Sequence, residues 1–274
     1  MKNITDLGFC NGVLTSLNTL EFLKKKANHI YLYSPLMHNN FEVEKLLSEK
    51  VSYYHGERLN QNDVILFSAH GSTLEEEKQF PIQKRVHALC PIIKNTYERL
   101  NQHRDIPIYL FGSKNHREVK AILSHFDHVI FQEKEDFLSS LPKGKYGIAF
   151  QSTYDANSAL EIERAVSDNK EAILINHTCP VVKERIEHAL NCLKNEDLSS
   201  ACLLVFGSKD SANANLMLKT LTDHFHMEGY LVNEERDLPL DKIKGKELFF
   251  ASSTSISKER CERLIESVIS LSRS

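Results

Sequence analysis

The sequence predicts an α/β protein made of three similar small units with parallel sheets, arranged as a pseudo-threefold trefoil. Short apolar runs of strand type alternate along the 274 residues with segments of helical apolar period. Two kinds of strand-end loop and one kind of cysteine segment each occur three times, always in the same order. Strands that alternate with helices favour parallel sheets joined by right-handed crossovers.

The first recurring element is a strand followed by a polar turn and a helix. Its copies cover residues 30–47, 108–123 and 202–220. In each copy an apolar run breaks at Ser, Gly or Pro, passes small polar residues and enters a helical period. We therefore expect a strand and its following helix in each of these three ranges.

The second element is a strand ending in small polar residues, and the third is a cysteine before a helix. Copies of the second cover residues 63–72, 145–154 and 247–256. Copies of the third cover residues 6–13, 87–95 and 175–185, and in the last two a proline follows the cysteine and suits a first helical turn. Strands of any α/β protein end in such polar residues, but the conserved order of three elements favours a true repeat.

Polar side chains that follow these strands are the candidate ligand-binding residues. In open parallel sheets ligands bind beyond the carboxyl ends of the strands. If three units pack around one axis, the loop residues and the cysteines converge on a central cavity. We predict units at residues 1–92, 93–178 and 179–274, and a binding site containing His38, His70, His116, Glu118, Ser152, Ser211, Asn213 and Ser255.

Three cysteines, Cys10, Cys90 and Cys179, occupy equivalent positions in the repeat. Three converging thiolates repel one another unless a cation or a cluster holds them. The short spacing typical of structural zinc sites is missing, so an iron–sulfur cluster with one iron free of protein ligands is the favoured interpretation. The other three cysteines are expected to be buried core residues: Cys192, Cys202 and Cys261.

The loop chemistry suits a phosphate group and a proton relay. Imidazoles, hydroxyls and amides near helix starts can donate to an anion, although helix capping explains the Ser and Asn residues equally well. His116 and Glu118 stand two residues apart, which suits proton transfer in a shielded cavity, or alternatively a solvated helix start. Most other histidines, including His125 and His128, are expected at the surface.

Composition narrows the class of protein. The net charge is −3 and the pI is near 6.5, which argues against non-specific nucleic-acid binding. No apolar run reaches the roughly 18 residues of a membrane span, and residues 1–10 carry no secretory h-region. We therefore expect a cytoplasmic protein in which thiols stay reduced and serve as ligands, catalysts or core residues.

The ordered motifs resemble the LytB/IspH family of 4-hydroxy-3-methylbut-2-enyl diphosphate reductases over nearly the whole chain. They are GFCNGV (8–13), HNN (38–40), SAHG (68–71), CP (90–91), NHREV (115–119), QST (151–153), Cys179 with Arg185, and GSKDSANAN (207–215). The resemblance implies three α/β domains in a trefoil around a 4Fe–4S cluster. It further implies an oxidoreductase that removes the allylic hydroxyl of its substrate to give isopentenyl and dimethylallyl diphosphate in isoprenoid biosynthesis.

The resemblance also assigns roles to residues. Cys10, Cys90 and Cys179 match the cluster ligands, and Glu118 matches the carboxylate that feeds protons to the leaving hydroxyl. His116 and Ser152 match further active-site residues, with Ser152 where the family carries Thr. The residues that match substrate contacts are His38, His70, His116, Ser152, Ser211, Asn213 and Ser255. Ferredoxin or flavodoxin is the implied electron donor.

Several positions depart from the family pattern. Leu7 stands where an Arg is usual, the second cysteine lies in HALCP, Ala212 replaces a diphosphate-binding Ser, and ASSTS (251–255) lacks the family's Gly. Such changes around retained functional groups affect substrate choice more than cluster binding. Three alternatives follow: a paralogue acting on another small anion, a redox sensor, or a clusterless binding protein. Three thiolates also suit a 3Fe–4S form.

Overall fold

The computed structural model describes residues 1–272 and contains three four-stranded sheets. Every strand pairing within these sheets is parallel, so the predicted α/β class with three parallel sheets is confirmed. The two central strands of each sheet are mostly buried, which explains why they are apolar runs without alternation. Among the described residues, no helix combines the length and apolarity that crossing a bilayer requires.

The first sheet has the order β3-β2-β4-β5. Its strands are β2 (Ile30–Leu32), β3 (Val51–Tyr53), β4 (Val64–Phe67) and β5 (Arg85–His87). The intervening helices are α2 (Asn40–Glu44), α3 (Leu74–Lys78) and the 3-10 turn η1 (Ile82–Lys84), and α1 (Asn11–Lys24) precedes the sheet.

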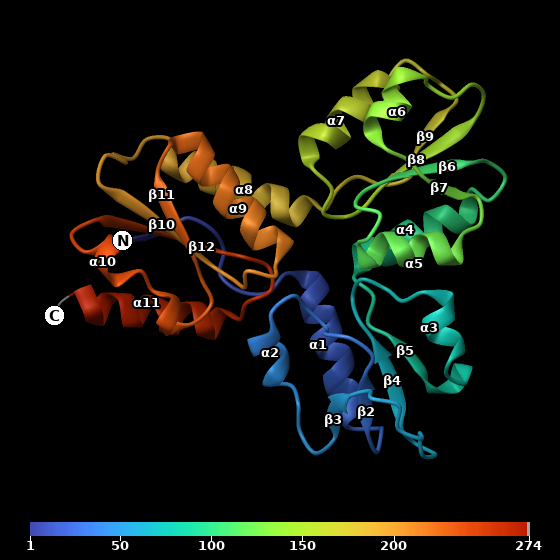
Figure 1. The fold of residues 1–274 in the computed structure, drawn as a ribbon, viewed down its shortest axis with the longest axis horizontal. Helices are drawn as coiled ribbons and strands as arrows, with labels where there is room; N and C mark the ends of the chain where they lie inside the picture. The colour runs from blue at the N-terminus through green and yellow to red at the C-terminus, as the bar shows by residue number, and fades with distance from the viewer. Residues whose placement is uncertain (273–274) are drawn as a thin grey trace. The chain divides into compact units, whose positions relative to one another are not determined.

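The second sheet repeats this pattern in the order β7-β6-β8-β9. Its strands are β6 (Ile108–Phe111), β7 (Val129–Phe131), β8 (Tyr146–Phe150) and β9 (Ala172–Leu174). Helices α4 (Pro91–Gln102) and α5 (Arg117–His125) pack on one face through Leu100, Val119 and Ile122. Helices α6 (Lys134–Ser139) and α7 (Ala156–Ala165) pack on the other face through Phe137, Ala159 and Ile162 (Figure 1).

The third sheet has the order β1-β12-β10-β11 and includes the start of the chain. Its strands are β1 (Lys2–Asn3), β10 (Ala201–Phe206), β11 (Glu228–Val232) and β12 (Glu247–Ser252). Its helices are α8 (Pro180–Leu193), α9 (Ala212–Phe225), α10 (Leu240–Ile243) and α11 (Lys258–Ser272), with the 3-10 turn η2 (Glu235–Asp237). Thus β1 takes the edge position that β5 and β9 take in the other sheets.

The chain divides into two compact units. The carboxyl-terminal unit comprises residues Met1–Val13, Met37–Leu46 and the chain from Val181 on, and it holds the third sheet. The central unit comprises Leu14–Leu36 and Leu47–Pro180, and it holds the first and second sheets. The boundaries predicted after residues 92 and 178 stay predictions.

Two glycines let the strand-end loops pack tightly within each unit. Gly112 and Gly207 both follow the last residue of a central strand in the repeated sequence FGSK. A Cβ at Gly112 would lie 2.7 Å from the Cβ of Gln151, and one at Gly207 would lie 2.5 Å from the Oγ of Ser253. The first loop of each unit therefore contacts the second loop at a distance that only glycine allows.

We expect Gly207→Ala to destabilise the carboxyl-terminal unit by roughly 2–3 kcal/mol because the added methyl overlaps Ser253 and Ala214. Urea unfolding followed by circular dichroism measures the change. Gly245→Ala is the comparison, since its Cβ meets nothing within 4 Å and its φ of +75° carries only a backbone cost of about 1 kcal/mol. Equal losses in the two variants would contradict the packing argument.

Candidate active site

The first loop of each repeat ends in a residue at a helix start. His116 is the N-cap of α5 and its Nδ1 accepts from the Glu118 N–H at 3.3 Å. Ser211 is the N-cap of α9 and its Oγ accepts from the Ala214 N–H at 3.3 Å. His38 directly precedes Asn39, the N-cap of α2. Strand and polar turn thus place His116 and Ser211 at the N-cap of the following helix, and His38 one residue before such a cap.

Two predicted histidines lie together in the central unit. The rings of His70 and His116 are nearly perpendicular, at 87°, and their centroids are 6.0 Å apart. His70 follows β4 and His116 follows β6, so the two imidazoles come from loops of different sheets. This spacing leaves room for both rings to contact one small anion.

Glu118 is a buried carboxyl of the central unit that only Ser152 is seen to contact among the described hydrogen bonds to its oxygens. Its side chain is 1% exposed, and its two oxygens accept from Ser152, from the N–H at 2.8 Å and from the Oγ–H at 2.6 Å. Burial raises the pKa of Glu118 to about 7, because desolvation outweighs the two bonds from Ser152, which lower it. A carboxyl with this pKa can give up and regain a proton near neutral pH.

A third group of predicted residues meets in the carboxyl-terminal unit. The Ser255 Oγ–H lies 3.5 Å from the His38 carbonyl and 3.4 Å from the Ser211 Oγ. Asn213 donates to the Thr254 Oγ at 3.0 Å. The Asn213 Oδ1 and the Ser253 Oγ are buried without a hydrogen-bond partner in this part of the chain. Unpaired buried acceptors and hydroxyls are costly unless a ligand satisfies them.

The short helix α2 belongs to the carboxyl-terminal unit although it follows β2 of the first sheet. Asn39 donates to the Asn233 Oδ1 at 2.9 Å, and the buried Glu42 accepts from the Ser257 N–H and Oγ–H at 3.2 and 2.9 Å. The Arg260 guanidinium lies 3.3 Å from the centroid of the Phe41 ring. These contacts fix the His38 loop beside Ser255.

The three repeat-equivalent cysteines share one backbone contact. The N–H groups of Cys10, Cys90 and Cys179 donate to the carbonyls of Thr254, Ala69 and Ser152, at 3.2, 3.1 and 2.6 Å. Each acceptor lies two residues past the end of β12, β4 or β8. Each cysteine also directly precedes a helix. All three are partly exposed, whereas Cys202 and Cys261 are buried.

Cysteine thiolates are the ligands of iron–sulfur clusters, so each of these three residues is of a type that fits such a group. Cys10 belongs to the carboxyl-terminal unit, and Cys90 and Cys179 belong to the central unit. Within residues 1–272, no group of three or more His, Cys, Asp or Glu residues is placed to hold a metal ion. The fit therefore rests on the thiols, their exposure and their repeated backbone contact.

Cys192 differs from the expectation. Cys202 and Cys261 are buried core residues as predicted, and burial raises the pKa of the Cys202 thiol to about 11. Cys192 is only partly buried, and its sulfur lies 3.8 Å from the His188 Nδ1. The prediction for Cys192 is wrong because this face of α8 is not fully covered.

Arg185 connects the Cys10 segment to the Ser255 loop. Its guanidinium donates to the carbonyls of Ser252, Ser253 and Gly8 at 3.2, 2.9 and 2.9 Å. Burial lowers the pKa of Arg185, while Cys10 and Asp6 favour its charged form. A cavity of about 390 Å³ opens beside it, lined by Asp6, Phe9, Cys10, Asn11, Val181, Glu184, Arg185 and His188. The guanidinium therefore bonds backbone carbonyls of the Cys10 segment and of the Ser255 loop at the same time.

Sequence reasoning missed several residues that support these loops. Glu42, Asn233 and Ser257 hold α2. Asn233 and Ser257 lie outside the repeated segments, and the contacts join residues that are 194 to 215 positions apart in sequence. The one available signal was the acidic residue in the first turn of a short helix, which is also typical of a solvated helix start.

Comparison with known proteins gives consistent matches. The family described as LytB protein matches residues 2–269. A relative from Dictyoglomus thermophilum is 28% identical over 97% of this chain and 95% of its own length. A relative from Nautilia profundicola is 27% identical over 96% of this chain and 95% of its own length. Both are named 4-hydroxy-3-methylbut-2-enyl diphosphate reductase, an oxidoreductase.

Two solved structures share the fold. A structure of (E)-4-hydroxy-3-methyl-but-2-enyl diphosphate reductase, described as the terminal enzyme of the non-mevalonate pathway, aligns with a TM-score of 0.69 and 23% identity over 100% of this chain and 99% of its own. The reductase from Plasmodium falciparum aligns with a TM-score of 0.77 and 21% identity over 96% of this chain and 86% of its own.

The raised pKa of Glu118 predicts how stability depends on pH. Below about pH 4.5 the carboxyl is protonated in the folded and the unfolded state, so its stabilising contribution is complete, and this contribution is lost as pH rises through about 7. Between these values the free energy of unfolding should fall by roughly 3 kcal/mol relative to Glu118→Gln.

Urea unfolding of the chain and the variant between about pH 5 and pH 8 measures this difference. The exposed Glu98 provides the control, because Glu98→Gln should leave the pH dependence unchanged. Parallel curves for the chain and Glu118→Gln would show that burial does not perturb the carboxyl.

Proposed function

The chain belongs to the LytB protein family, and from this premise we propose that it is a 4-hydroxy-3-methylbut-2-enyl diphosphate reductase. In this reaction two electrons and two protons replace the allylic hydroxyl, which leaves as water, and the products are isopentenyl and dimethylallyl diphosphate. The observation that carries the proposal is Glu118, a fully buried carboxyl with a pKa of about 7 in contact with Ser152. A reaction that expels hydroxide as water needs such an acid.

Cys10, Cys90 and Cys179 would hold a 4Fe–4S cluster. Their repeated contact with strand-end carbonyls and their places before α1, α4 and α8 support this role. When bound, the cluster supplies the electrons and an iron without a protein ligand that acts as a Lewis acid toward the hydroxyl. A small electron-transfer protein, ferredoxin or flavodoxin, would deliver the electrons singly.

Glu118 would supply a proton to the leaving hydroxyl. Its protonated fraction is about one half at pH 7, so a proton is available at neutral pH without a strong acid in the site. The two bonds from Ser152 fix the carboxyl in one orientation. Since Glu118 is almost completely buried, the exclusion of water lets it protonate the substrate rather than exchange with solvent.

The diphosphate would be held mainly by hydrogen bonds. In the central unit, His70 and His116 offer two ring nitrogens from neighbouring loops. In the carboxyl-terminal unit, His38, Ser211, Asn213 and Ser255 offer an imidazole, hydroxyls and an amide, with buried unpaired oxygens next to them. Helix N-termini at α5 and α9 add N–H groups and favour negative charge.

Turnover of the purified protein tests the proposal directly. Anaerobically prepared protein with a reduced electron donor should convert 4-hydroxy-3-methylbut-2-enyl diphosphate to the two products, and the gene should restore growth of a bacterium depleted of its own reductase. Protein with full iron content that does neither would support the alternatives of another small anionic substrate or a sensing role.

Glu118→Gln should lower kcat by about 10²- to 10⁴-fold, since the amide cannot donate an acidic proton. In the unsubstituted protein kcat should fall above about pH 7, because Glu118 loses its proton. The residual kcat of the variant should not show this decrease with pH. Iron content is the control and should be equal in both. A variant with full turnover would exclude Glu118 as the proton donor.

Replacing any one of Cys10, Cys90 and Cys179 by Ser should reduce bound iron and the iron–sulfur absorbance to a small fraction, because each thiolate contributes one ligand. Cys192→Ser is the matched control, as Cys192 is also a partly exposed thiol on a helix. Iron analysis of anaerobically purified protein measures both. An equal loss of iron in Cys192→Ser would contradict the assignment of ligands.

A further inference from the structure

The loop that follows β4 is bonded to helix α5 at two places, one near the start of the helix and one near its end. At its start, the Arg117 Nε–H donates to the Gly71 carbonyl at 3.2 Å. At its end, the His125 Nε2 lies 3.0 Å from the Ser72 carbonyl, and the Ser124 Oγ accepts from the Leu74 N–H at 3.1 Å. A carbonyl only accepts, so the His125 Nε2 carries the proton. Three side chains of one helix thus satisfy backbone groups of residues 71–74.

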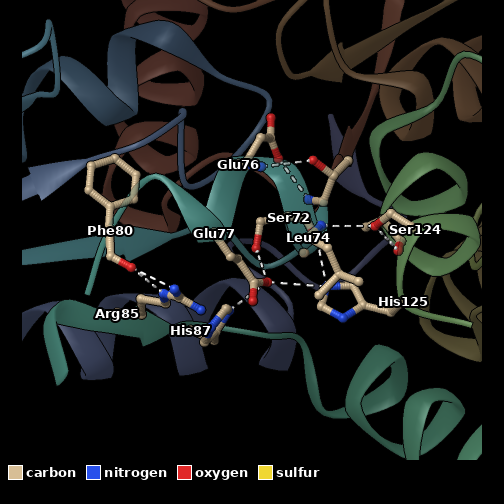
Figure 2. Close-up of polar contacts among 12 residues, drawn as sticks. Ser72, Leu74, Glu76, Glu77, Phe80, Arg85, His87, Ser124 and His125 are labelled. Atoms are coloured by element: carbon tan, nitrogen blue, oxygen red, sulfur yellow. Dashed lines mark hydrogen bonds and ion pairs between the residues drawn. The ribbon is translucent and has the colours of Figure 1, made fainter. Parts of the chain in front are cut away.

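Two carboxylates of α3 reinforce this contact, and Figure 2 shows the contacts of Glu77 with Ser72, His87 and His125. The Glu76 Oε1 pairs with the Arg117 Nη2 at 3.2 Å. The buried Glu77 Oε1 accepts from the Ser72 Oγ–H at 2.6 Å and pairs with the His125 Nε2 at 3.2 Å, and the His87 Nδ1 is 3.8 Å away. His125 was expected at the surface, but the structure places it between α5 and this buried carboxylate.

Gly71 lets the loop approach α5 closely. Its φ is +87°, and a Cβ at this position would lie 3.0 Å from the Tyr97 Oη and 3.2 Å from the Ala121 Cβ. Glycine is therefore required both by the backbone conformation and by the contact with α5. The close approach is independent of the polar contacts and brings the same two segments together.

The residues proposed for substrate binding lie next to these contacts. His70 directly precedes Gly71, and His116 and Glu118 flank Arg117. Glu118 in turn fixes the same end of α5 to Ser152. The separation of the His70 and His116 rings therefore depends on how the loop is held against the helix.

We propose that Arg117, Ser124 and His125 are positioning residues that lock the His70 loop onto α5, so that His70 and His116 bind a diphosphate as one preorganised pair. The role rests on the proposed function, which assigns the two histidines to the diphosphate. Preorganised groups lose less freedom on binding, so the lock increases affinity without touching the ligand. Arg117 and Glu76 are 33% and 27% exposed, and such pairs add little to stability. Loss of the pair should therefore change binding more than folding.

Binding of inorganic pyrophosphate to the full-length protein, measured by isothermal titration calorimetry, tests the lock without turnover. Arg117→Gln should weaken binding about fivefold to tenfold. In a protein that already carries His70→Ala, the substitution Arg117→Gln should weaken pyrophosphate binding less than about twofold, because the histidine that Arg117 positions is absent. Arg104→Gln is the matched control, since Arg104 is an exposed arginine of the same unit that bonds Asn101 and lies over the Phe126 ring, without a contact to residues 71–74 among those described. Equal losses in both backgrounds would overturn the positioning role.

A second variant separates positioning from direct contact. His125 is eight residues from Arg117, about 12 Å along the helix, so it cannot share the anion with His116. Ser124→Ala and His125→Leu should each weaken pyrophosphate binding about threefold or more, whereas His125→Gln, which keeps a donor, should retain most of the affinity. Wild-type affinity in both Ser124→Ala and His125→Leu would overturn the proposal.

Amide hydrogen exchange gives a readout that does not depend on the ligand. In Arg117→Gln and His125→Leu, residues 68–74 should exchange about tenfold faster while α5 stays protected. Unchanged exchange, with normal pyrophosphate binding by the unsubstituted protein, would overturn the lock alone. Absence of pyrophosphate binding by the unsubstituted protein would instead remove the diphosphate site of the proposed function and, with it, the role given to the lock.

Discussion

Burial of parallel strands on both faces determines where this protein can carry chemistry. Strands such as β8 and β10 are covered by helices on each side, so polar groups find no place along them. They gather instead at the carboxyl ends, where Ser152 and Ser253 follow β8 and β12. The same edge supplies the carbonyls that accept from Cys10, Cys90 and Cys179. The three cysteines and the polar strand-end loops therefore share one structural origin in every repeat.

The environment of Glu118 shows how two opposing effects determine the pKa of one carboxyl group. Complete burial disfavours the carboxylate, and two short bonds from Ser152 favour it. The balance leaves the pKa near neutrality, where an ordinary exposed Glu would be ionised. Because Ser152 also accepts from the Cys179 N–H through its carbonyl, the acid and one thiol depend on the same short loop. A change in that loop affects both.

The strands, the repeat and the strand-end residues could be predicted from sequence because they are local. His116 and Ser211 follow apolar runs and precede helical periods, and each is a helix cap. The pairing of β1 with β12 could not be predicted, since a two-residue strand has no period and its partner is far along the chain. The same holds for Glu42 with Ser257 and for His125 with Glu77, which are tertiary contacts between ordinary polar residues. The roles of the predicted site residues remain predictions.

The pairing of β1 with β12 has a consequence for how the chain is made. Residues 1–13 are synthesised long before β12, the strand with which β1 pairs. The backbone contact of Cys10 with Thr254 forms only after that point. The central unit, by contrast, has all its residues by Pro180. A cofactor that needs Cys10 in this folded position can therefore bind only after β12 and Thr254 have been synthesised.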